Sequence, residues 1–194
     1  MARPKEFDRD AAVDRAMSVF WLKGYAATST DDLLQAMKIG RQSMYDTFGD
    51  KRRLYVEALE RYQRRSVAAH INRLRSTASP LAGIEALLVG VIPLDKATRE
   101  KGCMGVCSIS EFGNADAELA KLRAKSGGVL HQALVERLQG ALVAGEIGKT
   151  IDIERGARLV ETVMLGIQVA AKTGASAQAL RDTAAFAVAG LRNR

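Results

Sequence analysis

The sequence predicts an all-α protein of about nine helices, with a small N-terminal three-helix domain followed by a larger helical domain. Alanine and leucine are abundant, proline occurs only 3 times in 194 residues, and aromatic residues make up 5% of the chain. This composition favours helices over sheets. Apolar residues recur at helical spacing along most of the chain, and glycine or polar clusters separate these segments, so the helices can be placed one by one.

The formal net charge of +7 is unevenly distributed. Residues 1–76 hold 15 Lys and Arg against 10 Asp and Glu, whereas residues 77–194 hold 14 against 12. A basic N-terminal part indicates a polyanionic partner, and a solvated helical surface is the alternative interpretation.

Several classes of protein are disfavoured by what the sequence lacks. No apolar run reaches the roughly 18 residues that span a bilayer, and the N-terminus lacks the apolar region of a secretory signal. Two cysteines are too few for a disulfide framework. Phosphate-binding glycine loops, nucleophile elbows and zinc-ligand spacings are missing as well. We therefore expect a cytoplasmic protein that is not an enzyme and holds no metal or cofactor.

The first helix is expected to begin at a cap formed by Asp8 or Asp10 and to end at Gly24. Its buried stripe has the spacing i, i+3, i+4 and i+7 and consists of Val13, Ala16, Met17 and Phe20. The preceding basic arm, which carries Arg3 and Lys5, either lies along a minor groove or is a frayed terminus.

Residues 28–48 contain two short apolar-periodic segments separated by a break at Gly40. Ser29 and Asp32 have the spacing of a capping box at the start of the first segment. The second segment turns Met44 and Phe48 to one side, and its other face carries hydrogen-bonding residues: Arg41, Gln42, Ser43, Tyr45 and Thr47. Two short helices joined by a tight turn, the second with a polar outer face, are what a helix-turn-helix needs to enter a major groove.

A long helix is expected over about residues 51–76, and the following Ser/Thr/Pro segment to residue 80 is a domain boundary. Further helices are predicted over 81–93, 116–142 and 152–171, with a last one that reaches Leu191. Residues 95–102 are predicted to be a charged connection, and residues 102–112 form an apolar segment rich in small residues. The final two helices are rich in Ala and Gly, so they either pack against a second copy of the chain or complete its own core.

The first 60 or so residues resemble the TetR family of bacterial transcriptional regulators. The resemblance is carried, without a gap, by the first-helix stripe and then by Gly24-Tyr25, Thr28-Ser29, Asp32-Leu33, Ala36, Ile39, Ser43-Met44-Tyr45, Phe48 and Gly49-Asp50-Lys51. It implies a homodimeric repressor that binds a palindromic operator in double-stranded DNA and is released by a small-molecule effector. The implied organisation is a helix-turn-helix domain over 1–50, a connecting helix over 51–76, and an effector-binding and dimerisation domain over 77–194.

Carried over by position, the resemblance implies that seven residues contact the operator: Thr30, Arg41, Gln42, Ser43, Tyr45, Thr47 and Lys51. Near the start of the recognition helix, Arg suits guanine and Gln suits adenine at base edges. Tyr45, Thr47 and Lys51 are expected to contact phosphates. The sequence departs from the family pattern in several places. Met37 stands at the usual alanine, Lys38 at the usual turn glycine and Gly40 at the usual Ser or Thr cap, and Asp46 is an acidic residue on a helix that must approach phosphates.

Cys103 and Cys107 are four residues apart and share one face if the segment is helical. The Cβ atoms of such a pair lie about 6 Å apart, whereas a disulfide prefers about 3.8 Å. The thiols are therefore buried small side chains, effector or redox sensors, or, with Met104, ligands of a soft metal such as Cu(I). The alternative function is a thiol/redox- or small-molecule-binding helical protein with a degenerate DNA-binding motif, which Lys38, Gly40 and Asp46 permit.

Overall fold

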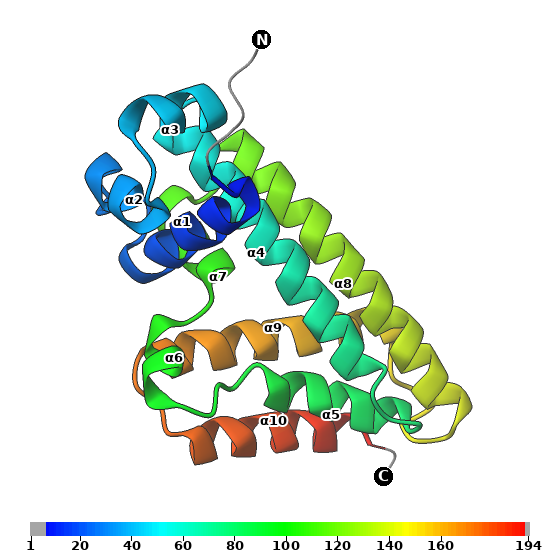
Figure 1. The fold of residues 1–194 in the computed structure, drawn as a ribbon. Coiled ribbons are helices and arrows are strands. Elements are labelled where there is room, and N and C mark those ends of the chain that lie inside the picture. The colour runs from blue at the N-terminus through cyan, green and yellow to red at the C-terminus, as the bar shows by residue number, and fades with distance from the viewer. Residues whose placement is uncertain (1–6, 193–194) are drawn as a thin grey trace. The chain divides into compact units, whose positions relative to one another are not determined.

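The computed structural model describes residues 7–192, and ten α-helices lie in this range (Figure 1). They are α1 (Arg9–Lys23), α2 (Thr30–Met37), α3 (Arg41–Phe48), α4 (Lys51–Leu74), α5 (Pro80–Gly90), α6 (Lys96–Lys101), α7 (Met104–Phe112), α8 (Ala117–Val143), α9 (Ile153–Lys172) and α10 (Ala177–Leu191). The all-α class is confirmed. The basic arm with Arg3 and Lys5 lies outside the described residues.

One helix more than expected arises in the segment predicted to be a charged connection. Asp95 caps α6 by accepting a hydrogen bond from the Thr98 backbone N–H at 2.8 Å, and Gly102 ends the helix with a φ of 68°. None of the six residues of α6 is buried, so the helix has no apolar stripe from which periodicity could identify it.

The helices group into two compact units. The first unit comprises the chain up to Gln63 together with Cys103–Leu122, and the second comprises Arg64–Gly102 together with the chain from Arg123 onward. Both α4 and α8 therefore contribute residues to each unit. These units describe packing, and the functional division at residues 50 and 76 stays a prediction.

The core of the first unit joins α1, α2 and α3 to the start of α4. Phe20 of α1 is 1% exposed, and its ring meets that of Tyr55 of α4 edge-on at 5.0 Å between centroids. Leu33, Met44 and Phe48 bring α2 and α3 into the same cluster. The two short helices are thus held by side chains that the periodicity predicts to face inward.

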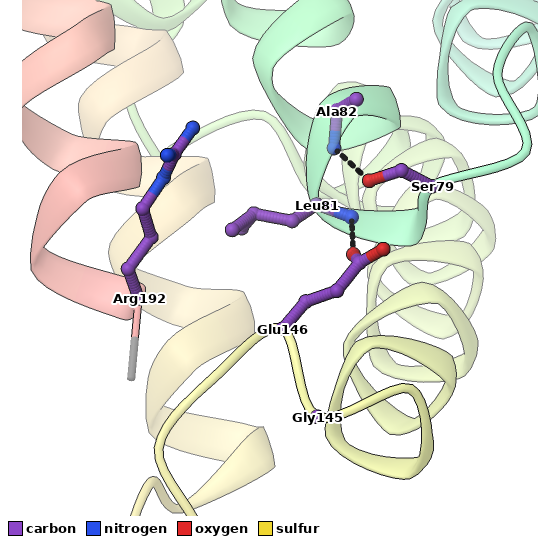
Figure 2. A pocket seen from close by; sticks show the side chains of 6 residues that line it. All are labelled: Ser79, Leu81, Ala82, Gly145, Glu146 and Arg192. Atoms are coloured by element: carbon purple, nitrogen blue, oxygen red, sulfur yellow. Dashed lines mark hydrogen bonds between the residues drawn. The ribbon is translucent and has the colours of Figure 1, made fainter. Parts of the chain in front are cut away.

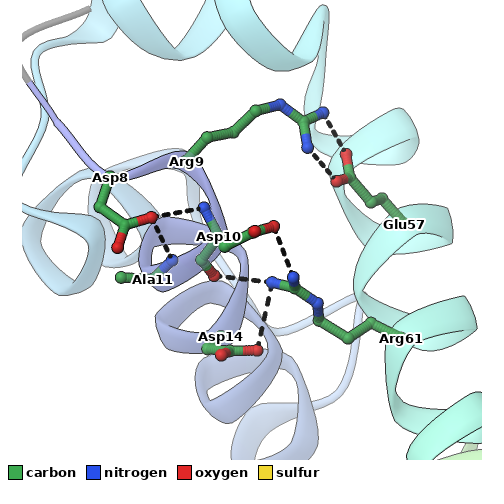
Figure 3. A network of polar contacts seen from close by, with 7 residues as sticks. All are labelled: Asp8, Arg9, Asp10, Ala11, Asp14, Glu57 and Arg61. Atoms are coloured by element: carbon green, nitrogen blue, oxygen red, sulfur yellow. Dashed lines mark hydrogen bonds and ion pairs between the residues drawn. The ribbon is translucent and has the colours of Figure 1, made fainter.

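A polar network joins the start of α1 to α4 (Figure 3). Arg9 makes a two-pronged ion pair with Glu57, at 2.5 and 2.9 Å. Arg61 donates to the backbone carbonyl of Asp10 at 2.7 Å and to the Asp14 carboxylate at 3.3 Å. These ion pairs therefore fix α1 on α4. The two helices together form the surface against which α2 and α3 pack.

The second unit contains a buried histidine on α4. His70 is 7% exposed, and burial together with the nearby Arg73 lowers its pKa to about 4. Because an arginine can only donate, His70 Nδ1 accepts from Arg73 at 3.2 Å, and Nε2–H donates to the Ser66 hydroxyl at 3.0 Å. His70 is therefore a neutral imidazole of defined tautomer at physiological pH.

We expect acid to destabilise the protein through His70. The unfolded chain binds a proton near pH 6.5 and the folded one only near pH 4, so this part of the stability is complete above pH 6.5 and is lost as the pH falls towards 4. The loss amounts to about 2 kcal/mol between pH 7.5 and pH 5. Urea unfolding at the two pH values should show a smaller difference for His70→Gln than for the wild type.

His131 is the matched control for this measurement. Hydrogen bonds to Glu154 and Glu161, at 3.0 and 3.2 Å, raise its pKa. Its stabilisation is therefore present below pH 6.5 and is lost as the pH rises through the raised value, so His131→Gln should act in the opposite direction. An unchanged pH dependence in His70→Gln would contradict the assignment.

Candidate nucleic-acid interface

The start of α2 is fixed by the predicted capping box. The Ser29 hydroxyl accepts from the Asp32 backbone N–H at 3.0 Å, and the Asp32 carboxylate accepts from the Ser29 N–H at 2.9 Å. Lys23 adds an ion pair to Asp32 at 2.7 Å. The hydrogen bond from Lys23, followed by those from Ser29, lowers the pKa of Asp32 to about 2. The Asp32 carboxylate of the capping box therefore stays ionised throughout the physiological pH range.

The turn between α2 and α3 contains a backbone conformation that glycine usually adopts. Lys38 caps the end of α2 with φ 57° and ψ 45°, and it is the one non-glycine residue with positive φ in the described range 7–192. The left-handed conformation costs an L-residue roughly 1–2 kcal/mol. The tight turn therefore forms without a glycine, and the left-handed conformation of Lys38 lowers the stability of the folded protein by this amount.

Lys38→Gly is expected to stabilise the protein by about 0.5–1 kcal/mol, because relief of the left-handed strain exceeds the entropy that glycine adds to the unfolded chain. Chemical denaturation of the two proteins measures the difference. Lys38→Ala is the control: it removes the same charge and retains the strained backbone. A stabilisation by both variants would mean that charge, rather than backbone strain, is responsible.

α3 turns its apolar side chains inward and its polar ones outward. Met44 and Phe48 are buried, whereas Tyr45 is 43% exposed. Arg41, Gln42 and Ser43 form the exposed first turn, after a glycine cap that makes no side-chain hydrogen bond. The structure thus places the predicted residues at the start of α2 (Thr30), on α3 (Arg41, Gln42, Ser43, Tyr45 and Thr47) and at the start of α4 (Lys51).

Two acidic residues bind the side chains of Arg41 and Gln42, which are the residues predicted to contact base edges. Asp31 of α2 pairs with Arg41 at 2.5 Å, and Asp46 accepts a hydrogen bond from the Gln42 amide nitrogen at 2.8 Å. A carboxylate only accepts, so Asp46 fixes which end of the Gln42 amide is the donor. The amide of Gln42 also has a second N–H and a carbonyl oxygen, and one donor beside one acceptor is the pair that suits adenine. The i, i+4 spacing of Gln42 and Asp46 is a signal that the sequence offers.

Lys51, the first residue of α4, lies against the turn that follows α1. Its ammonium nitrogen is 4.3 Å from the centroid of the Tyr25 ring, which is a cation–π contact. Tyr25 therefore supports a residue of the candidate interface, a role for which the sequence interpretation did not single it out.

The two cysteines lie at the start of α7, where both are thiols of intermediate exposure. Cys103 is the N-cap of the helix, and the Cys107 N–H donates to the Cys103 carbonyl at 3.0 Å. Burial, followed by the adjacent Cys103, raises the pKa of Tyr62. Both cysteines belong to the same compact unit as the helix-turn-helix.

A hollow of about 340 Å³ in the second unit is lined by Ser79, Leu81, Ala82, Gly145, Glu146 and Arg192 (Figure 2). Its polar groups serve the start of α5: the Glu146 carboxylate accepts from the Leu81 N–H at 2.7 Å, and Ser79 accepts from the Ala82 N–H at 3.1 Å. The start of α5 therefore already has an anionic partner, the carboxylate of Glu146.

Over the same described range, no three His, Cys, Asp or Glu side chains gather as a metal site would require. No helix among residues 7–192 combines the length and apolarity needed to cross a membrane.

Comparison with known proteins identifies the N-terminal motif. Residues 12–58 match the family model "Bacterial regulatory proteins, tetR family". Two curated proteins are similar along most of their length. The uncharacterised HTH-type transcriptional regulator YezE of Bacillus subtilis (strain 168) is 35% identical over 184 residues, covering 94% of this chain and 95% of YezE. The HTH-type transcriptional repressor ComR of Escherichia coli (strain K12) is 31% identical over 186 residues, covering 94% and 88%.

A solved structure of the TetR family regulator CifR, a cysteine mutant complexed with 26-bp double-strand operator DNA, matches with a TM-score of 0.80 and 30% identity. The match covers 96% of this chain and 98% of that one. A regulator from Cytophaga hutchinsonii shares the fold at 17% identity, with a TM-score of 0.83 over 100% and 99% of the two chains. Together with the motif over residues 12–58, these likenesses show that the chain belongs to the TetR family of bacterial transcriptional regulators.

Proposed function

We propose that this protein is a homodimeric repressor that works in the bacterial cytoplasm, binds a palindromic operator through α3, and is released from it by an effector. The observation that carries the proposal is the exposed first turn of α3, in which Arg41, Gln42 and Ser43 stand next to one another above a buried Met44 and Phe48. The complex of CifR, 30% identical to this chain, with operator DNA supports operator binding as the function of this chain.

Within this proposal the seven residues divide into two kinds. Arg41 and Gln42 reach base edges, since the first turn of a recognition helix enters the major groove. Thr30, Ser43, Tyr45, Thr47 and Lys51 contact phosphates and fix the register of the protein on the duplex. The exposed Asp31 and Asp46 then act as partners of the two base-reading side chains and prevent them from pairing with arbitrary phosphates.

Dimerisation is supported by apolar side chains that the single chain leaves exposed. Leu165 and Val169 on α9 are 42% and 45% exposed, and Phe186 on α10 is 84% exposed. Apolar surface of this kind is commonly covered by a partner, and we propose a second copy of the chain because a palindromic operator requires two α3 helices roughly 34 Å apart. Light scattering should give twice the chain mass of 20.9 kDa.

The proposal is tested by titrating the protein with a duplex from the DNA upstream of its own gene and with a scrambled duplex of equal length. A preference of at least about a thousandfold is expected at physiological salt. Equal affinity for the two duplexes would contradict the proposed function.

Lys51→Ala is expected to weaken binding to both duplexes by a similar factor, because a phosphate contact carries no sequence information. The slope of log affinity against log salt concentration should fall by about 1. Tyr45→Ala, which removes a neutral phosphate contact, should lower the affinity and leave the slope unchanged. A selective loss of operator preference in Lys51→Ala would instead assign Lys51 to base reading.

Effector release requires a ligand that binds the conformer unsuited to DNA more tightly. We propose that α4 carries the coupling, since its first residue contacts DNA and its last turns belong to the second compact unit.

A thiol-reactive effector is the second candidate, favoured by the partial exposure of Cys103 and Cys107. Adding N-ethylmaleimide, whose double bond takes up the cysteine sulfur and its proton, should release the operator from the wild type. The double variant Cys103→Ser/Cys107→Ser should remain bound. Equal release of both proteins would exclude these thiols.

A further inference from the structure

A carboxylate of α7 binds the turn that leads from α1 into the helix-turn-helix. Glu111 accepts hydrogen bonds from the backbone N–H groups of Tyr25 and Ala26, at 3.0 and 3.1 Å, across 86 and 85 residues of sequence. The turn approaches so closely that a Cβ on Gly24 would lie 2.8 Å from the Glu111 carboxylate oxygen. All of these residues belong to the first compact unit.

The residue that Glu111 holds is the one that supports Lys51. The Tyr25 ring is packed against Tyr55 at 5.0 Å and Phe112 at 5.4 Å between centroids, and the Lys51 ammonium lies over it at 4.3 Å. Phe112 directly follows Glu111 on α7. A displacement of α7 therefore changes both the backbone and the ring of Tyr25, and with them the position of Lys51.

We propose that Glu111 is a positioning residue for operator binding, which sets the turn after α1, and through Tyr25 the ammonium of Lys51, in the arrangement that fits the DNA. This role rests on the proposed function, because it presupposes that Lys51 contacts a phosphate. It makes the end of α7 part of the DNA-reading machinery although it lies some 60 residues beyond the helix-turn-helix in sequence.

Because Glu111 is negatively charged, electrostatics and a positioning role predict opposite changes in DNA affinity when it is substituted. DNA repels a carboxylate, so the loss of Glu111 through electrostatics alone strengthens binding to any duplex. Loss of its two hydrogen bonds to the turn weakens binding to the operator. A positioning role therefore predicts that neutralising an acidic residue lowers operator affinity, opposite to the electrostatic expectation.

The experiment compares Glu111→Gln, Glu111→Asp and Glu118→Gln in the full-length protein with the operator and scrambled duplexes described above. Glu111→Gln replaces one of the two oxygens that accept these bonds by an NH2 group, which can only donate. Glu111→Asp keeps the charge on a side chain one methylene shorter. Glu118 is the matched control: it belongs to the same segment of the first unit, its side chain is 65% exposed, and its partner Arg52 keeps a 2.6 Å pair with Asp116.

Both Glu111 variants should bind the operator about tenfold more weakly, which corresponds to the loss of a hydrogen bond to a charged group. Their affinity for scrambled DNA should be unchanged or higher, and Glu118→Gln should not lose operator affinity. Stoichiometric titration gives the active fraction, so that Kd refers to folded protein, and a merely structural role would lower this fraction without raising Kd.

Operator binding by both Glu111 variants as tight as that of the wild type overturns the proposal, and so does an equal weakening on both duplexes. A wild type that fails to discriminate between the duplexes contradicts the proposed function itself.

Discussion

Arg41→Ala is expected to weaken operator binding by roughly 10- to 100-fold, the loss that accompanies a good base contact. Two effects act in the same direction. The variant removes the guanidinium from the first turn of α3, and it leaves Asp31, whose side chain is 80% exposed, without the ion pair seen at 2.5 Å. An unpaired carboxylate next to the groove repels the phosphates. Competition titration with the operator and its single-base variants measures both the affinity and the lost discrimination.

Arg75→Ala is the control for Arg41, because it removes the same charge from a side chain that is 68% exposed just after the end of α4. Its operator preference should equal that of the wild type. The double variant Asp31→Asn/Arg41→Ala should recover part of the affinity but none of the discrimination. If Arg41→Ala loses affinity equally for operator and scrambled DNA, Arg41 contacts phosphate and does not read bases.

Gly83→Ala is expected to destabilise the protein by about 3 kcal/mol, the upper part of the usual range for overpacking. A Cβ at this buried position of α5 would lie 2.2 Å from the backbone carbonyl oxygen of Leu74 and 2.9 Å from Arg137 Nε. The carbonyl is backbone and cannot rotate away. Arg137 is itself held by the carbonyls of Thr77 and Ser79, at 2.5 and 3.0 Å. The end of α4 and the start of α5 must therefore separate.

Thermal unfolding should show this change as a fall in Tm of roughly 6–12 °C, since 1 kcal/mol corresponds to about 2–4 °C in a chain of this size. Gly128→Ala is the control. It lies within α8 with nothing within 4 Å of the added Cβ, so it should stabilise the helix by up to about 1 kcal/mol. A Tm of Gly83→Ala equal to that of the wild type would mean that α5 shifts without penalty.

Much of the fold follows from local chemistry that is visible in the sequence. Asp8 caps α1, and Ser29 and Asp32 form the capping box of α2, each as expected. The apolar stripe of α1 is buried apart from Met17, which is only partly buried. Helix α6, which was not predicted from the sequence, has no buried residue. A helix this short is stabilised by its cap and its surroundings, so it needs no apolar stripe that periodicity could reveal.

The candidate interface was less completely predictable. The exposure of Arg41, Gln42 and Ser43 follows from the inward face of α3, which Met44 and Phe48 define. The partners of these residues depend on tertiary contacts: Asp31 reaches Arg41 across the turn, and Glu111 reaches Tyr25 over 86 residues. Neither pairing leaves a pattern in a single sequence, since no local spacing connects the two ends.

The glycine that caps the start of α3 affects the thermodynamics of recognition. Gly40 supplies no side-chain acceptor to the first turn, and a Cβ added to it would meet no atom within 4 Å. The leading N–H groups of α3 are among those that a helix cannot satisfy internally, so this end is prone to fray in water. The residues proposed to read bases therefore lie in a first turn that no side-chain cap stabilises. The free energy needed to order the first turn then reduces the free energy of binding. This favours DNA sequences that make good contacts with the ordered turn.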